Sequence, residues 1–72
     1  MLLSLAPLGE INRIKAIWCD EETRNFLEVL GFLIDTEVIV KSKLYDDSFI
    51  IYVGNKRMAI GEELARKIIV GP

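Results

Sequence analysis

The clearest pattern of hydrophobic and polar positions in the chain predicts a helix over residues 20–30. Asp20 is a good N-cap, and the two glutamates that follow it place negative charge in the first turn, where the helix dipole favours it. Apolar positions then recur at the i, i+3, i+4, i+7 spacing of one buried helix face. That face is predicted to hold Thr23, Phe26, Leu27 and Leu30.

The same pattern also predicts where this helix ends. Gly31 follows the last apolar position and supplies a residue that adopts a left-handed backbone easily. Phe32 comes next and is expected to fold back on Leu27, as in a Schellman motif. The helix therefore has a local signal at each end.

Shorter runs rich in β-branched and aromatic residues predict strands in the second half of the chain. Residues 44–47 read as a hairpin connection, and Gly54-Asn55 reads as a two-residue turn. Residues 61–67, with acids first and bases last, predict one or two turns of helix. The predicted strands are residues 36–43, 48–53, 56–60 and 68–70.

Residues 10–17 are harder to assign. Ile11, Ile14 and Ile17 are three positions apart, a spacing that fits a helix or an irregular strand. The β-branched content and the preceding Pro-Leu-Gly turn favour a strand with a bulge. The whole pattern then predicts a mainly β fold of five strands, with one inserted helix and a short helical turn before the last strand.

Composition narrows the class of protein. The chain has 72 residues, which predicts a single domain over residues 1–72, and 51% of them are hydrophobic. The net charge of −2, with both signs interspersed, argues against a nucleic-acid partner. No run approaches the roughly 20 apolar residues that cross a bilayer, and no basic segment opens a secretory signal. We therefore expect a cytoplasmic protein that does not insert into a membrane.

No residue pattern predicts catalysis, a cofactor or a metal site. The chain has no histidine to act as a general base. Cys19 is the single cysteine, which excludes an internal disulfide and favours a small, partly buried apolar role over a reactive thiol. Asp20 and its two neighbouring glutamates are explained by capping, so we expect no catalytic, cofactor or metal-binding residue.

Five segments in fixed order resemble one known family, the FeoA proteins of ferrous iron transport. The helix segment RNFLEVLGF matches the family's Arg-x-x-Leu-x-x-Leu-Gly pattern, and Ile34-Asp35-Thr36 stands where the family has Pro-Gly-Thr. Asp46-Asp47-Ser48 replaces Gly-Asp-Pro in the hairpin. The opening LSLAPLG and the ending ARKIIV complete the match, so the resemblance covers nearly the whole chain.

The resemblance implies an SH3-like barrel, a unit that also forms the C-terminal domain of some metal-dependent repressors. It implies a non-enzymatic accessory protein that contacts the cytoplasmic GTPase region of a membrane ferrous iron transporter. The alternative is a stand-alone SH3-like peptide-binding or repressor-associated module. Weak self-association is left open. Asp35 in place of a turn glycine is tolerable because aspartate enters the left-handed region more readily than most residues.

Candidate partner-binding residues are Arg24 on the helix and residues 44–47 of the hairpin. Arg24 either contacts a partner, even as an arginine finger toward a GTPase, or pairs with Glu28 one turn later, which we favour. Leu44 and Tyr45 either form an exposed patch with Leu2, Leu3 and Phe32 or pack locally over a barrel end. Asp46 and Asp47 are typical turn formers and complete the candidate set.

Overall fold

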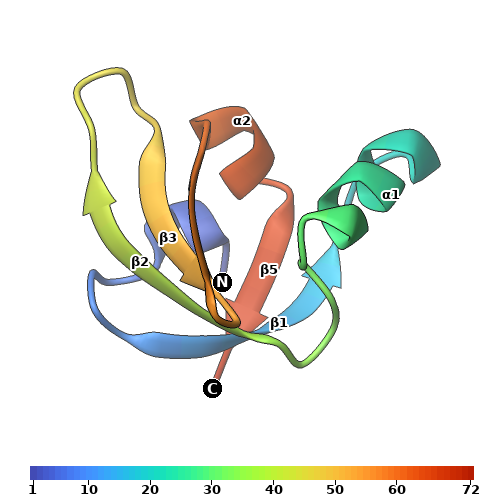
Figure 1. The fold of residues 1–72 in the computed structure, drawn as a ribbon, viewed down its shortest axis with the longest axis horizontal. Coiled ribbons are helices and arrows are strands. Elements are labelled where there is room, and N and C mark those ends of the chain that lie inside the picture. Colours follow the sequence, from blue (N-terminus) through green and yellow to red (C-terminus); the bar gives the residue numbers. More distant parts are fainter.

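A computed structural model describes all residues from 1 to 72 (Figure 1). It confirms the predicted mainly β fold of five strands with one inserted helix and a short helical turn. The strands form one antiparallel sheet in the order β4-β3-β2-β1-β5. The elements in chain order are the 3₁₀ helix η1 (Leu3–Leu5), β1 (Ile11–Ile17), α1 (Glu21–Val29), β2 (Glu37–Lys43), β3 (Phe49–Val53), β4 (Lys56–Ile60), α2 (Glu62–Ala65) and β5 (Ile68–Gly71).

The sheet coils around a core, but it does not close by pairing its first and last strands. β4 and β5 are its two edges. The outer edge of β5 is covered by the start of the chain, because Leu2 bridges Ile69 and the Val70 amide donates to the Met1 carbonyl at 2.7 Å. β3 is the only strand that pairs with β4, so the other edge of β4 stays open.

β1 has the predicted bulge, and the bulge changes which residues face inward. Its register with β5 shifts between Ile14 and Ala16. Before the shift, Asn12 and Ile14 are buried while Ile11 is 60% exposed. The three isoleucines therefore do not share one buried face, because Ile11 points outward. The buried Asn12 amide donates from Nδ2 to Glu10 Oε1 at 3.0 Å, which satisfies this polar group inside the fold.

α1 begins and ends as predicted. Asp20 Oδ1 accepts from the Thr23 amide at 3.1 Å, which confirms the N-cap. At the other end the Phe32 amide donates to the Leu27 carbonyl and the Gly31 amide to the Glu28 carbonyl, both at 3.0 Å. These two bonds, with φ of +106° at Gly31, make a Schellman motif.

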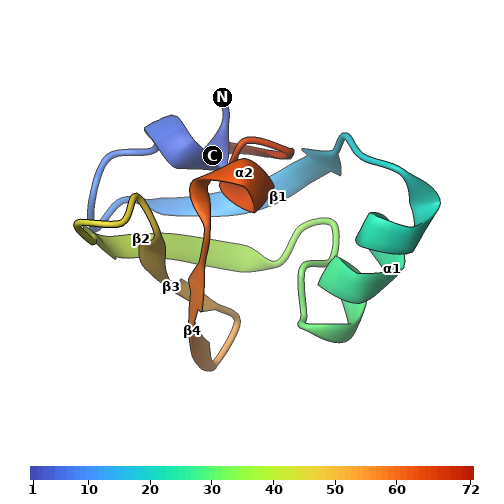
Figure 2. The same ribbon diagram turned by 90° about the horizontal axis from the view of Figure 1, so that it is seen from above.

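The buried face of α1 is narrower than predicted. Leu27 is its only buried residue, and Leu30, just after the helix, is half-buried. Phe26 is 55% exposed, so its assignment to the core is wrong. Figure 2 shows α1 beyond the end of the sheet, in agreement with the burial of a single residue of this helix.

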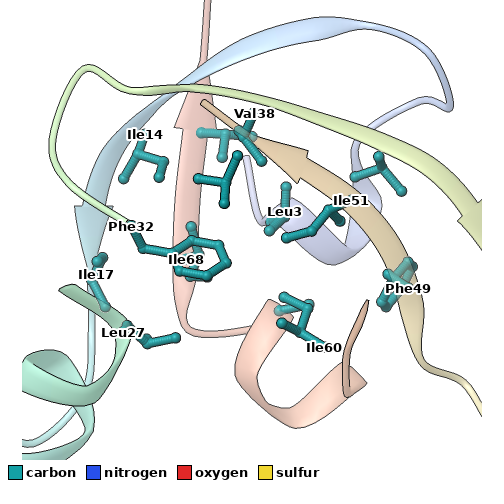
Figure 3. Close-up of a cluster of buried hydrophobic side chains, with 14 residues drawn as sticks. Leu3, Ile14, Ile17, Leu27, Phe32, Val38, Phe49, Ile51, Ile60 and Ile68 are labelled. Carbon is teal, nitrogen blue, oxygen red and sulfur yellow. The ribbon is translucent and has the colours of Figure 1, made fainter. Parts of the chain in front are cut away.

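The core is one cluster of fourteen buried apolar side chains (Figure 3). Every helix and strand contributes at least one of them, and β4 contributes Ile60. Its largest fully buried members include Leu3 from η1, Phe32 after α1 and Ile68 from β5. Figure 3 shows Leu27 and Phe32 pointing into this cluster together with Ile68. The Schellman turn thus places both side chains that fasten α1 to the sheet. No helix is long and apolar enough to cross a membrane.

Candidate functional site

The connection between β2 and β3 is a compact turn over residues 44–47. The Leu44 amide donates to the Ser48 carbonyl at 2.8 Å, and the Asp47 amide donates to the Leu44 carbonyl at 3.1 Å. These bonds close the hairpin at its tip, at the opposite end of the molecule from α1 in Figure 1. The candidate hairpin residues are therefore held on an ordered turn.

The two aspartates of this turn act as the predicted turn formers. Asp46 Oδ1 accepts from the Ser48 hydroxyl at 2.6 Å and from the Ser48 amide at 3.2 Å. The hydroxyl bond, and then the amide bond, lower the pKa of Asp46 because both stabilise its carboxylate. Asp47 adopts φ of +64°, and its carboxylate lies 3.8 Å from Lys43 Nζ. Asp46 and Ser48 thus hold the turn by side-chain hydrogen bonds, while Asp47 takes a left-handed backbone position.

Leu44 and Tyr45 present apolar surface at the tip. Tyr45 is fully exposed and Leu44 is 42% exposed. Together with Lys43 they line a shallow hollow. The larger patch predicted with Leu3 and Phe32 does not exist, because both of those side chains are buried in the core. The hairpin tip is therefore a small apolar projection with charged neighbours.

Arg24 makes a contact that the sequence analysis did not predict. Its Nη2 donates to the Ile17 carbonyl at 2.8 Å, across the junction between β1 and α1. The predicted ion pair with Glu28 is wrong, since only the Arg13–Glu37 and Lys43–Asp47 pairs come within 4.0 Å. A carbonyl at the end of β1 is a fixed acceptor, whereas an exposed Glu28 side chain is mobile, so the directed bond is favoured. Arg24 and the hairpin residues do not form one site.

Cys19 has the apolar role that the sequence favours. It is half-buried, free, and packed against the hydrophobic core. No three histidine, cysteine, aspartate or glutamate side chains gather closely enough to hold a metal ion. Asp20 is occupied by its cap, and the hydrogen bond from the Thr23 side chain, followed by that from the Thr23 amide, lowers the pKa of its carboxyl group.

Two apolar surfaces were missed by the sequence prediction. The first, here called the α1 surface, consists of Phe26, Val29, Leu33 and Ile34 with Glu22. Its apolar members are 50–81% exposed. Phe26 and Val29 are three residues apart and share a helix face. The sequence pattern placed Phe26 in the buried stripe and gave no prediction for Val29.

The second, here called the sheet surface, is the outward face of β1 to β4. It consists of Ile11, Ile39, Ile50, Tyr52 and Ala59 with Lys41 and Arg57. Ile11 pairs with Ile39, Ile39 with Tyr52, and Tyr52 with Arg57, so these residues make one cross-strand row. Lys41 Nζ lies 5.2 Å from the centre of the Tyr52 ring. The β1 bulge hid this row, because it reverses the side of the sheet that Ile11 faces.

A separate hollow lies beside the exposed Trp18. The Trp18 side chain is 73% exposed, and the Trp18 amide donates to the Lys67 carbonyl at 2.8 Å. Leu2, Glu63 and Arg66 complete the lining. Trp18, Tyr45 and Tyr52 thus lie in three separate hollows and build no shared aromatic groove.

Comparison with known proteins identifies the chain's relatives. The family model described as the FeoA domain matches residues 1–72. No curated protein matches the chain. Among solved structures, an iron uptake regulatory protein, FeoA, is 27% identical with a TM-score of 0.89, and the match covers 99% of this chain and 95% of that one.

Two further structures share the fold. The FeoA of Stenotrophomonas maltophilia, an SH3 domain protein solved in complex with zinc, is 24% identical with a TM-score of 0.82, over 97% of this chain and 88% of that one. The metal-dependent transcriptional regulator MtsR is 22% identical with a TM-score of 0.76, over 99% of this chain but 35% of MtsR. The fold is therefore SH3-like, as expected.

Proposed function

The chain belongs to the FeoA family, and from that premise we propose that it is a non-enzymatic accessory protein of ferrous iron transport that works by binding a protein partner in the cytoplasm. The partner that we propose is the cytoplasmic GTPase region of a membrane ferrous iron transporter. The match of the family model to residues 1–72 carries this proposal. The proposal takes residues 1–72 as one domain.

The chemistry of the surface supports binding in preference to catalysis. There is no histidine, and neither acidic segment gathers into a paired carboxylate site, since Asp20 is held by Thr23 and Asp46 by Ser48. By contrast, Tyr45 is a large side chain with a polar tip, fully exposed on a hydrogen-bonded turn. Exposed tyrosines on rigid supports are frequent anchors of protein interfaces, because few rotamers are lost on binding.

We propose that the hairpin tip makes the contact with Leu44 and Tyr45 as its apolar centre and Asp46 and Asp47 as its polar rim. Apolar anchors within a charged border are the usual anatomy of a protein interface. Arg24 belongs to α1, which Figure 1 shows at the opposite end of the molecule from the hairpin, so a partner that contacts both must span the domain. Arg24 would act on a GTPase only after leaving the Ile17 carbonyl.

The test is a calorimetric titration of the chain into the purified GTPase region of the transporter from the same organism. We expect binding, and we expect Tyr45→Ala to weaken it at least tenfold, in line with the roughly 2 kcal/mol or more of an aromatic anchor. Leu8→Ala is the matched control, because Leu8 is 62% exposed and is not one of the hairpin residues 44–47, and it should bind as the unmodified chain does.

Two outcomes would count against the proposal. Absence of binding by a folded sample at a concentration of several hundred micromolar would reject the partner. Equal losses for Tyr45→Ala and Leu8→Ala would reject the hairpin as the contact while leaving the partner in place.

A further inference from the structure

The α1 surface has no partner within its own chain. Phe26 and Val29 on the helix and Leu33 and Ile34 just after it are all at least half exposed, and Val29 is 81% exposed. Leu27 is the only residue of α1 that is buried, so the rest of the helix contributes little to the core. An apolar helix face without cover on a small domain marks a place where another surface docks.

The charges on α1 define what that other surface must carry. Glu22 lies one turn before Phe26 on the same helix face, whereas Glu28 lies in the last turn on another side of the helix. No basic residue occupies that last turn, although the negative end of the helix dipole favours one there. Arg24, the one base of α1, points to the Ile17 carbonyl. The α1 surface is therefore apolar and negative, and an apolar, positive surface would complement it.

The chain itself carries such a surface on its sheet. The row formed by Ile11, Ile39 and Tyr52 runs across the outward face of three strands and ends at Arg57 on β4. Lys41 stands over the Tyr52 ring. Neither Lys41 nor Arg57 has a carboxylate within 4.0 Å, because the two ion pairs of the molecule use other residues. The sheet surface is therefore apolar with two uncompensated positive charges.

The α1 surface cannot contact the sheet surface of the same molecule, because α1 and the strands β2 and β3 lie apart in both views of the fold (Figures 1 and 2). We propose that the α1 surface of one copy docks on the sheet surface of a second copy. The contact is heterologous, because each copy uses a different surface. Each bound copy then presents a free α1 surface at one side and a free sheet surface at the other, so the assembly grows into a ring or a short chain. This proposal does not depend on the iron transporter.

Two double variants separate this contact from other modes of association. Glu28→Lys with Val29→Lys blocks the α1 surface while placing the cations that the helix dipole favours. Lys41→Glu with Arg57→Glu blocks the sheet surface. All four positions are exposed, so both variants should fold, which circular dichroism and urea unfolding would check. Lys15→Glu with Arg66→Glu is the control for the sheet-blocked variant, because it makes the same change in net charge at exposed positions outside both surfaces.

Sedimentation velocity at roughly 10 µM to 1 mM protein, the concentration range of weak contacts, measures the outcome. In 0.1 M NaCl we expect the average mass of the unmodified chain and of the control variant to rise with concentration beyond that of a dimer. Raising NaCl to 1 M shortens the screening length from about 10 Å to about 3 Å, so the association should weaken. Each blocked variant alone should stay monomeric.

The decisive sample is the mixture of the two blocked variants. Each retains the surface that the other has lost, so the mixture should form a one-to-one dimer and nothing larger. A dimer formed by the sheet-blocked variant alone would show α1 pairing with α1 and overturn the proposal. So would a mixture that stays monomeric while the unmodified chain associates, or an unmodified chain that stays monomeric throughout.

Discussion

Three single residues of this chain hold backbone or capping positions that decide local structure. Asp35 has φ of +70°, the left-handed geometry expected when it stands in place of a turn glycine, and its amide donates to the Ile14 carbonyl at 2.8 Å. Gly31 and Asp20 mark the two ends of α1. All three roles were predicted from the sequence, because turn and cap chemistry depends on neighbouring residues only.

Replacing Gly31 by alanine should cost about 1–2 kcal/mol of unfolding free energy, the penalty for an L-residue at positive φ. An added Cβ would meet no atom within 4 Å, so the whole loss comes from backbone conformation. Urea unfolding measures it. Gly61→Ala is the control, since that site is equally open and has φ of −75°. A loss at Gly31 no larger than that at Gly61 would contradict the Schellman geometry.

The Asp20 cap should give the protein a measurable loss of stability in acid. Hydrogen bonds from Thr23 lower its pKa below the ordinary value of 3.8. A carboxyl whose pKa is lowered by folding stabilises the protein at higher pH, and that stabilisation disappears as the pH falls through the lowered pKa.

Asp20→Asn should therefore keep the cap, because asparagine caps as well as aspartate. It should also make the loss of stability below about pH 4 smaller, because an unperturbed aspartate begins to take up its proton there. Urea unfolding at a series of pH values compares the two proteins. If the unfolding free energy of the asparagine variant fell in acid as steeply as that of the unmodified chain, folding would not change the pKa of the Asp20 carboxyl group.

At the scale of elements, order and bounds were predictable but orientation was not. The predicted helix over residues 20–30 is observed as Glu21–Val29, and the strand over residues 56–60 is observed as Lys56–Ile60. Such bounds follow from caps, turns and local periodicity. Which side of β1 faces inward depends on a bulge, and how much of α1 is covered depends on its placement at the end of the sheet.

Leu27→Ala and Phe26→Ala should behave very differently, although the two residues are neighbours on α1. Leu27 is fully buried, so its truncation leaves a cavity and should cost about 2–5 kcal/mol. Phe26 is 55% exposed, so its truncation should cost less than about 1 kcal/mol. Urea melts of the two variants decide the helix orientation, and similar losses for both would place α1 in a different rotation.

At the scale of the whole molecule, the start of the chain is a structural part of the barrel. Leu3 is 1% exposed and joins the core from η1, an element that the sequence pattern did not predict. Three residues give too little periodicity to identify a 3₁₀ turn, and the burial of Leu3 depends on a bridge to β5 at the other end of the chain. The α1 surface and the sheet surface could not be predicted from the sequence for the same reason. Their exposure is set by packing between segments that are distant in the chain.

Leu3→Ala should therefore destabilise the fold by about 2–5 kcal/mol, as a substitution in the centre of the core does. Leu5→Ala, two residues later in the same short helix, should be nearly neutral because Leu5 is 71% exposed. Thermal unfolding followed by circular dichroism would show the difference. A neutral Leu3→Ala would mean that η1 does not seal the barrel.

The contact between Met1 and Val70 has a consequence for the modular use of this fold. The Met1 nitrogen donates to the Val70 carbonyl at 2.9 Å, so entry and exit of the chain lie side by side. A unit with adjacent ends can be inserted into a surface loop of a host protein without a large change in that loop's conformation. The same arrangement would let the two ends be joined by a short linker and new ends be opened at the Gly54-Asn55 turn.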